Sequence, residues 1–232
     1  RGYDSCGIAL CTEGHLERSR STSRVAELEK QVNGHHLSGF LGIAHTRWAT
    51  HGAPTTDNAH PHFSGKRIAL VHNGIIENHA ELREALKMKG YVFSSQTDTE
   101  VIAHLIDSFY QGDLLEAVGR VLHRIQGAYA LGIICADYPN ALIAARKESP
   151  LILGFSPEGN FIASDVTAII KYTRDVVYMD DGEIAVLTAD SVDVFDDELM
   201  PVEKTHSLVD WDVSAAEKGG YAHFMAKEIM EQ

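Results

Sequence analysis

The sequence contains little cysteine and comparatively little positive charge. Its 232 residues include 3 cysteines (Cys6, Cys11 and Cys135) and 20 lysines and arginines, against 33 acidic residues. A small, odd number of cysteines without a CxxC pair argues against a disulfide framework, so we expect reduced thiols and a cytoplasmic protein. The net charge of −13 argues against nucleic acid or an anionic membrane as a partner, because both require a basic face.

Long apolar runs are also missing. No run approaches the roughly 20 residues that a membrane-spanning helix needs, so we expect no membrane partner. The 13 histidines raise the question of a metal site, and His60 and His62 could supply two ligands. Pro61 separates them, however, and no cysteine or His-x-x-His partner lies nearby. We therefore expect neither a metal nor a cofactor.

Helical patterns occupy the middle of the chain, and strand patterns lie on both sides of it. Apolar residues at helical spacing predict helices over 80–89, from about 97 to 111, and over 114–125. Short apolar runs separated by turn residues predict antiparallel strands. The predicted strands are 5–10, 41–45, 68–72, 129–135, 141–145, 151–155, 160–163, 176–179, 183–187 and 192–195. This order predicts an α+β fold with two packed sheets and outer helices.

The end of the chain has a different character. Residues 201–220 are charged and irregular, and they close with two glycines that suit a flexible joint. Residues 221–232 have an apolar stripe at helical spacing. We expect one domain over residues 1–218 and a linker helix over residues 219–232 that leads to a further domain. The alternative is a terminal helix that packs back on the first domain.

The segment from His45 to Gly52 combines an arginine, an indole, hydroxyls and two imidazoles. The planar fork of Arg47 suits a carboxylate, because it can donate two parallel hydrogen bonds. Thr50 and the backbone beside Gly52 can add further donors. This segment therefore predicts a binding loop for a small carboxylate-bearing molecule. The alternative is the end of a strand with scattered polar residues.

Two further clusters carry polar groups. Asn73 and Gly74 follow a predicted strand, and their adjacent N–H groups suit an oxyanion hole, although Asn-Gly is also a common turn. Asp98 stands at a predicted helix start, where it could cap the helix or bind an ammonium group. Arg47 and Asp98 together would recognise an α-amino acid. An oxyanion hole beside them indicates hydrolysis of a side-chain amide.

These clusters resemble motifs of the class II glutamine amidotransferases and stand in the same order. The resemblance covers nearly the whole chain and is strongest to the branch that aminates fructose 6-phosphate. The motifs are residues 1–5, 45–52, 58–62, 72–79, 97–102 and 221–232. The resemblance implies an N-terminal-nucleophile hydrolase fold, a four-layer α/β/β/α sandwich. It implies L-glutamine and L-glutamate as ligands and a sugar isomerase domain in the same polypeptide, and we expect a homo-oligomer for the full-length protein.

The resemblance also implies roles for individual residues. In the family, the thiol of an N-terminal cysteine attacks the glutamine amide, the free α-amino group acts as base, and a thioester forms. The roles carried over are Arg47, Thr50 and His51 for the substrate carboxylate, Asp98 with Gly74 for the ammonium group, Asn73 and Gly74 for the oxyanion hole, Trp48 for a mobile lid, and Arg1, Gly2 and His60 as support for the nucleophile strand.

The sequence departs from the family at the nucleophile. The family begins with Cys-Gly-Ile about two dozen residues before the first motif, whereas this chain begins at Arg1. Cys6 is followed by Gly7 and Ile8 but has no α-amino base, so we expect a core position there. We expect the first strand and helix of the fold to be missing from a longer chain. As it stands, we predict an inactive and poorly stable protein.

Three alternatives remain open from the sequence. The first is a module that binds glutamine or glutamate without turnover. The second is an interaction domain with a vestigial site. The third is the amidotransferase domain of a phosphoribosyl-pyrophosphate enzyme, which shares the fold and the order of the sites.

Overall fold

A six-stranded antiparallel sheet forms the centre of the protein, in the order β12–β11–β7–β6–β5–β4. The computed structural model describes residues 3–35 and 37–210. The strands are β4 (His62–Ser64), β5 (Ile68–Ile76), β6 (Gly127–Cys135), β7 (Tyr138–Lys147), β11 (Ile184–Leu187) and β12 (Val192–Phe195). Side chains alternate along β5: Ile68 and Leu70 join one apolar cluster, and Ala69 and Val71 join another. Both faces of this sheet are therefore covered.

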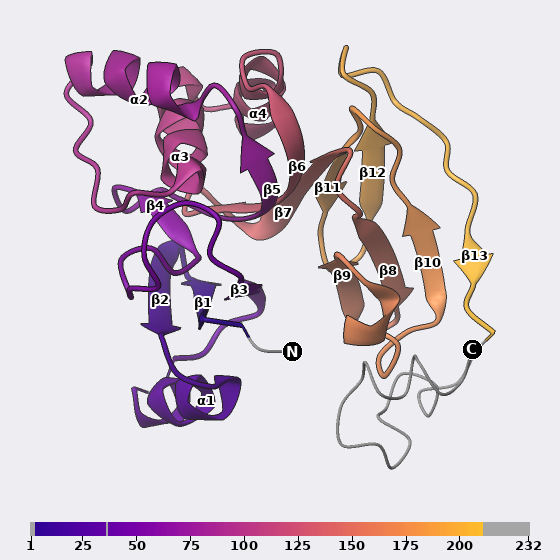
Figure 1. Cartoon of the computed structure of the whole chain (residues 1–232). Coiled ribbons are helices and arrows are strands. Elements are labelled where there is room, and N and C mark those ends of the chain that lie inside the picture. The colour runs from indigo at the N-terminus through magenta and orange to yellow at the C-terminus, as the bar shows by residue number, and fades with distance from the viewer. Residues whose placement is uncertain (1–2, 36, 211–232) are drawn as a thin grey trace, which may run out of the picture.

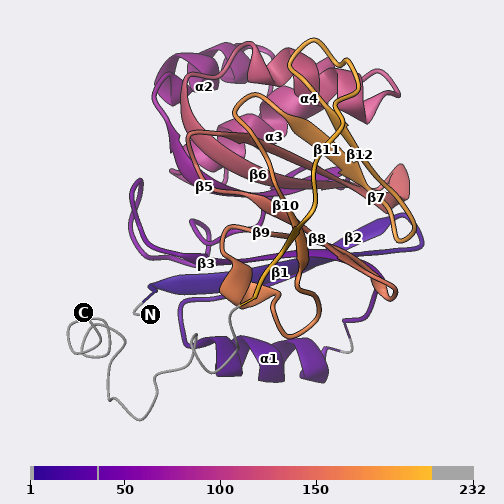
Figure 2. The same cartoon turned by 90° about the vertical axis from the view of Figure 1, so that its right-hand side faces the viewer.

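Three helices cover one face of the six-stranded sheet, as Figure 2 shows at the top of the molecule. They are α2 (His79–Met88), α3 (Asp98–Phe109) and α4 (Leu114–Leu122). Helix α3 is buried continuously from Asp98 to Ile106, because it lies between the sheet and the other two helices. Its N-terminal cap is Thr97, whose hydroxyl accepts a hydrogen bond from the Glu100 N–H. Asp98 is therefore the first residue of the helix and not its cap.

Two smaller sheets pack against the other face. One has the order β2–β1–β3 and the other β13–β10–β8–β9. These strands are β1 (Ser5–Thr12), β2 (His15–Ser21), β3 (Leu41–Arg47), β8 (Ile152–Ser156), β9 (Gly159–Ala163), β10 (Asp175–Tyr178) and β13 (Ser207–Leu208). Within the described residues, β3 and β9 each have one edge without a strand partner.

The fourth layer lies beneath these smaller sheets. Helix α1 (Val25–Gly34) packs under the first of them through Leu28. The short helix η1 (Val166–Ala168) covers the second. Figure 1 shows α1 apart from the three upper helices, with the strands between. The arrangement confirms the predicted four-layer α/β/β/α sandwich.

Within the described residues, the ten predicted strands and the three predicted helices of the middle of the chain all occur, most of them with shifted ends. Five described elements were not predicted from the sequence: α1, β2, β4, η1 and β13. Strand β2 is rich in charged residues, and α1 buries one side chain, so neither shows a strong apolar period. Residues 1, 2 and 219–232, with their predicted roles, lie outside the described residues. None of the described helices is long and apolar enough to cross a membrane.

Candidate active site

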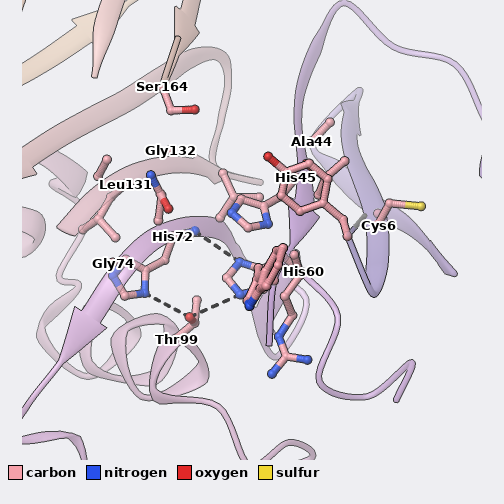
Figure 3. Close-up of a pocket in the computed structure, with 18 of the residues that line it drawn as sticks. Cys6, Ala44, His45, His60, His72, Gly74, Thr99, Leu131, Gly132 and Ser164 are labelled. Carbon is pink, nitrogen blue, oxygen red and sulfur yellow. Dashed lines mark hydrogen bonds between the residues drawn. The ribbon is translucent and has the colours of Figure 1, made fainter. Parts of the chain in front are cut away.

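A cavity of about 780 Å³ lies where β1, β3, β5, β6 and β9 approach the start of α3. Figure 3 shows part of its lining, with residues that come from both layers of sheet. Every predicted site residue that the structure describes lines this cavity. These residues are Arg47, Trp48, Thr50, His51, His60, Asn73, Gly74 and Asp98. Segments far apart in the sequence thus meet at a single hollow, which has room for a small molecule.

Arg47 is the last residue of β3 and is 3% exposed. Its guanidinium donates to the backbone carbonyls of His51 at 2.5 Å, Gly52 at 3.3 Å and Ala53 at 3.4 Å. It also forms an ion pair with Asp4 at 3.5 Å. Arg47 therefore folds the loop that follows it, a role that the sequence did not predict. A carboxylate ligand would have to compete with these carbonyls for its N–H groups.

Trp48 and Thr50 lie in the loop that Arg47 organises. The Trp48 side chain is 69% exposed although it borders the cavity. The N–H of the next residue, Ala49, donates to the Asp4 carboxylate. Asp4 thus holds both Arg47 and the backbone beside Trp48. An indole that is free of packing at the rim of a cavity is suited to contact a ligand or to cover it.

Asn73 and Gly74 lie inside β5, where they pair with Ala130 and Tyr129 of β6. They do not form a turn, so the turn interpretation of this Asn-Gly pair is wrong. Gly74 has a φ of +142°, and a Cβ on it would lie 2.1 Å from the Ala128 carbonyl oxygen. Because neither that backbone angle nor that space suits a side chain, glycine is required here.

Asp98 is 3% exposed, at the N-terminus of α3. One carboxylate oxygen accepts the Ile76 N–H at 2.8 Å. The other lies 4.0 Å from His51 Nδ1, and His72 Nδ1 lies 3.9 Å from the carboxylate. The backbone N–H groups at the start of a helix favour a negative charge. Asp98 is therefore a fixed carboxylate with one oxygen turned toward His51, which itself lines the cavity.

Buried imidazoles form part of the cavity wall, as Figure 3 shows for His45, His60 and His72. His60 Nδ1 accepts the His72 backbone N–H at 3.3 Å. The Thr99 hydroxyl lies 3.0 Å from His72 Nδ1 and 3.4 Å from His60 Nε2, so it bridges the two rings. His45 stacks on His60 with the ring centroids 4.2 Å apart. These contacts fix the ring of His60, for which the sequence predicted a supporting role.

Burial keeps these imidazoles uncharged. It lowers the pKa of His60 well below its ordinary value, and the neighbouring imidazoles lower it further. It lowers the pKa of His45 to about 4 and that of His62 to about 3. For His72, burial lowers the pKa despite the opposing charge of Asp98. Neutral imidazole offers one donor and one acceptor, so this wall is polar without carrying charge.

The sequence reasoning missed Glu100, which organises the loop before α3. Its carboxylate is 2% exposed and accepts four hydrogen bonds, from the N–H and the hydroxyl of Ser94 and of Ser95, at 2.6–2.8 Å. Burial opposes its ionisation. The nearby His104 imidazole, whose Nε2 lies 3.7 Å from the carboxylate, and the hydrogen bonds from Ser95 and Ser94 more than offset that effect and hold its pKa well below the ordinary value. The Thr-x-x-Glu spacing from Thr97 is a helix-start signal that could have drawn attention to it.

The three cysteines are all buried, and burial raises the pKa of each thiol. Cys6 lines the cavity, but its thiol lies 3.5 Å from the Ser23 carbonyl oxygen and is 3% exposed. A thiol with a raised pKa is a poor nucleophile at neutral pH. Among the described residues, no group of three or more His, Cys, Asp or Glu side chains is arranged to hold a metal ion.

Comparison with known proteins identifies relatives of this chain. The chain is 54% identical over 237 residues to a protein of Bordetella pertussis named glutamine–fructose-6-phosphate aminotransferase (isomerizing), and 51% identical over 233 residues to one of the same name from Clostridium acetobutylicum. These alignments cover 100% of this chain but 39% and 38% of the relatives. The chain thus spans about two fifths of the length of the curated relatives it matches.

Solved structures resemble this fold as well. Glutamine phosphoribosylpyrophosphate amidotransferase from B. subtilis has a TM-score of 0.71 at 23% identity, covering 86% of this chain and 44% of that one. A structure described as the allosteric regulatory enzyme of purine biosynthesis has a TM-score of 0.71 at 25% identity, covering 84% and 43%. A sequence profile described as "Glutamine amidotransferase domain" matches residues 45–171, more than half of the chain. The chain therefore belongs to the family of glutamine amidotransferase domains.

Proposed function

We propose that this chain is the glutaminase domain of an enzyme that aminates fructose 6-phosphate. The domain releases ammonia from L-glutamine, and a sugar isomerase domain of the same polypeptide uses the ammonia to form glucosamine 6-phosphate. Residues 1–218 form the glutaminase domain, and residues 219–232 lead into the isomerase domain. The full-length protein is a homo-oligomer. The names of the relatives that are 54% and 51% identical support this substrate.

One observation carries the proposal. Three groups that were predicted from separate motifs border one cavity: the guanidinium of Arg47, the fixed carboxylate of Asp98 and the Asn73–Gly74 pair. Arg47, with Thr50 and the backbone of His51, binds the substrate α-carboxylate, and Asp98 binds the α-ammonium. Trp48 covers the bound ligand, and His60 supports the strand that carries the nucleophile.

The reaction follows from these positions. A cysteine thiolate attacks the carbonyl carbon of the glutamine side-chain amide, and the C=O π electrons move to oxygen. The Asn73 side-chain N–H and the Gly74 backbone N–H stabilise that oxyanion. The oxyanion electrons then re-form the C=O bond as the C–N bond breaks, and a thioester remains. The α-amino group of the cysteine, which took the thiol proton, passes it to the leaving nitrogen, which departs as ammonia. Water hydrolyses the thioester to glutamate and restores the thiol.

The proposal takes the thiolate from a cysteine upstream of Arg1, because the three cysteines within the chain are buried and have raised pKa values. The experiment compares glutamate release from glutamine by this chain and by one extended upstream to begin at that cysteine. Activity confined to the extended chain is expected. Activity of this chain that is lost in Cys6→Ala would contradict the proposed nucleophile.

A second candidate function is a module that binds glutamine or glutamate without turnover. The three buried thiols favour it, since none of them is placed as a nucleophile. It predicts that both chains bind L-glutamate and that neither releases it from glutamine. The phosphoribosyl-pyrophosphate alternative is less well supported, because those structures are 23% and 25% identical to this chain.

A further inference from the structure

The side chain of Asn58 joins two loops that carry different parts of the cavity wall. Its Nδ2 donates to the Ala53 carbonyl at 2.9 Å, and its Oδ1 accepts the Gln96 N–H at 2.8 Å. Asn58 is 3% exposed. The asparagine side of both hydrogen bonds is therefore shielded from water, although the partner residues Ala53 and Gln96 are exposed.

Each partner of Asn58 is tied to one of the charged residues at the cavity. The Ala53 carbonyl also accepts from Arg47 Nη1 at 3.4 Å, so it belongs to the turn that Arg47 organises. Gln96 stands two residues before Asp98, directly in front of the cap of α3. One amide group thus spans from the Arg47 side of the cavity to the Asp98 side.

Asn58 is itself held from outside the cavity. Arg20 of β2 donates to the carbonyls of Asp57 and Ala59, both at 3.0 Å, and so holds the backbone on each side of Asn58. Gly52 leaves room for the amide, because a Cβ on it would lie 2.5 Å from Asn58 Nδ2. These contacts fix the amide between its two partners and leave it little freedom to follow either loop.

We propose that Asn58 is a positioning residue that sets the spacing between Arg47 and Asp98. By doing so it selects ligands that carry a carboxylate and an ammonium group on the same carbon. This role depends on the proposed function, in which those two side chains bind the two groups. An amide suits the position because it donates on one side and accepts on the other, which neither a carboxylate nor an alkyl side chain can do.

The test replaces the amide by a side chain of similar size without polar atoms, Asn58→Leu, in the full chain. Binding is measured by NMR titration with L-glutamate, with glutarate, which lacks the amino group, and with 4-aminobutyrate, which lacks the α-carboxylate. We expect the Kd for L-glutamate to rise roughly tenfold and the other two to change less than about twofold, because each of those ligands engages one side only. An equal change for all three ligands would overturn the proposal.

Asn78 provides a matched control. Its side chain also joins two backbone groups, donating to the Arg124 carbonyl at 2.8 Å and accepting from the Gln126 N–H at 3.0 Å. It does not border the cavity. We expect Asn78→Leu to leave the ratios among the three ligands unchanged. A loss of selectivity in this variant as well would mean that general loosening, and not spacing, explains the effect.

A second measurement needs no ligand. Amide hydrogen exchange at Gln96 reports on the hydrogen bond from its N–H to Asn58 Oδ1. Exchange at Thr55, whose N–H donates to the Ala53 carbonyl at 2.8 Å, reports on the loop that Asn58 Nδ2 contacts. Asn58→Leu should speed exchange at both sites. Asn58→Asp, a conservative second variant in case the first does not fold, should speed it at Thr55 more than at Gln96. Unchanged exchange would overturn the role of Asn58, whereas failure of the unaltered chain to bind L-glutamate would count against the proposed function.

Discussion

The two halves of the described chain bury different kinds of side chain. Up to His104, the core contains fifteen buried polar or charged residues, whereas from residue 105 to 210 it contains three, Ser149, Thr173 and Glu183. The second half fills its interior with alternating apolar residues of β6 to β12. A buried polar group destabilises the fold unless it is hydrogen-bonded. The first half meets most of that demand with a dense network beside the cavity, and four of its imidazole nitrogens, in His45, His51, His79 and His104, are buried without a hydrogen-bond partner among the described residues.

This difference shows that the half of the chain beside the cavity is held together by buried hydrogen bonds as well as by apolar packing. In the second half, one buried apolar residue can be substituted by another of similar size with a small loss of stability. In the first half, Glu100 accepts four hydrogen bonds, and Asn58 and Thr99 each bridge two partners. Removal of one such residue leaves several groups unsatisfied at once. Substitutions in the two halves should therefore differ in cost even at equal burial.

The largest effect is expected for Glu100→Ala. It leaves the buried donors of Ser95 without the Glu100 carboxylate and also removes the acceptor of the exposed Ser94, so the free energy of unfolding should fall by about 3–5 kcal/mol. The control is Glu116→Ala, which removes an exposed ion pair with Arg120 at 2.6 Å and should cost less than about 1 kcal/mol. Urea unfolding of both variants measures the difference. Similar losses would contradict the conclusion that the buried hydrogen bonds of Glu100 stabilise the first half.

Arg47→Ala should weaken L-glutamate binding by about a hundredfold, because the ligand carboxylate would lose its charged partner. Calorimetric titration measures the effect. Arg47 also donates to three carbonyls of its own loop, so Arg47→Lys, which keeps the charge but not the planar guanidinium, serves as a second variant.

Arg146→Ala is the control from the second half. That arginine likewise contacts a carbonyl, of Met179 at 2.5 Å, and a carboxylate, of Asp181 at 2.7 Å, but does not border the cavity. Unchanged affinity in both Arg47 variants would exclude the carboxylate role.

The buried histidines of the first half should make stability depend on pH. Burial lowers the pKa of His62 to about 3 in the folded protein, against about 6.5 in the unfolded chain. The unfolded chain therefore takes up the proton first, and stability is complete above pH 6.5 and falls as the pH decreases toward 3.

Between pH 7.5 and 5.5, this linkage removes about 1.4 kcal/mol per histidine. His62→Gln should reduce the pH dependence by about that amount, since glutamine can still contact Thr97 but does not titrate. The effect of Glu100 does not overlap, because its lowered pKa costs stability only as the pH falls below about 4.5. Unfolding curves at the two pH values, recorded for both chains, measure the difference. An identical pH dependence in His62→Gln would show that His62 is not the titrating group.

The sequence predicted the second half better than the first. Strands β6 and β7 contain apolar runs, and helix α4 follows an apolar period, so each element could be recognised without its neighbours. Strand β2 was missed because its inner contacts are made by arginines: Arg18 and Arg20 donate to carbonyls of the loop before β4. Such a strand shows no apolar alternation, and its role depends on a loop about forty residues away.

The sequence predicted residues that border one cavity, but not the contacts that connect them. Arg47, Asn73, Gly74 and Asp98 were predicted from separate motifs, and the structure brings them to one cavity. The hydrogen bonds that connect these segments are made by the side chains of Asn58, Thr99 and Glu100. No local pattern reveals that an asparagine bridges residues 53 and 96, because the distance between two loops depends on the packing of the whole sandwich.

The smallest effect expected comes from two glycines with similar backbone angles. Gly74, at the cavity, has a φ of +142°, and Gly159, in the second half, has a φ of +138°. Alanine at either position is strained by the backbone. A Cβ on Gly159 meets nothing within 4 Å, whereas one on Gly74 lies 2.1 Å from the Ala128 carbonyl oxygen. Gly74→Ala should therefore cost at least about 1 kcal/mol more than Gly159→Ala, because β5 must move away from β6. Urea unfolding compares them. Equal losses would show that the backbone angle alone, and not the close approach beside Asn73, requires glycine at this point of the site.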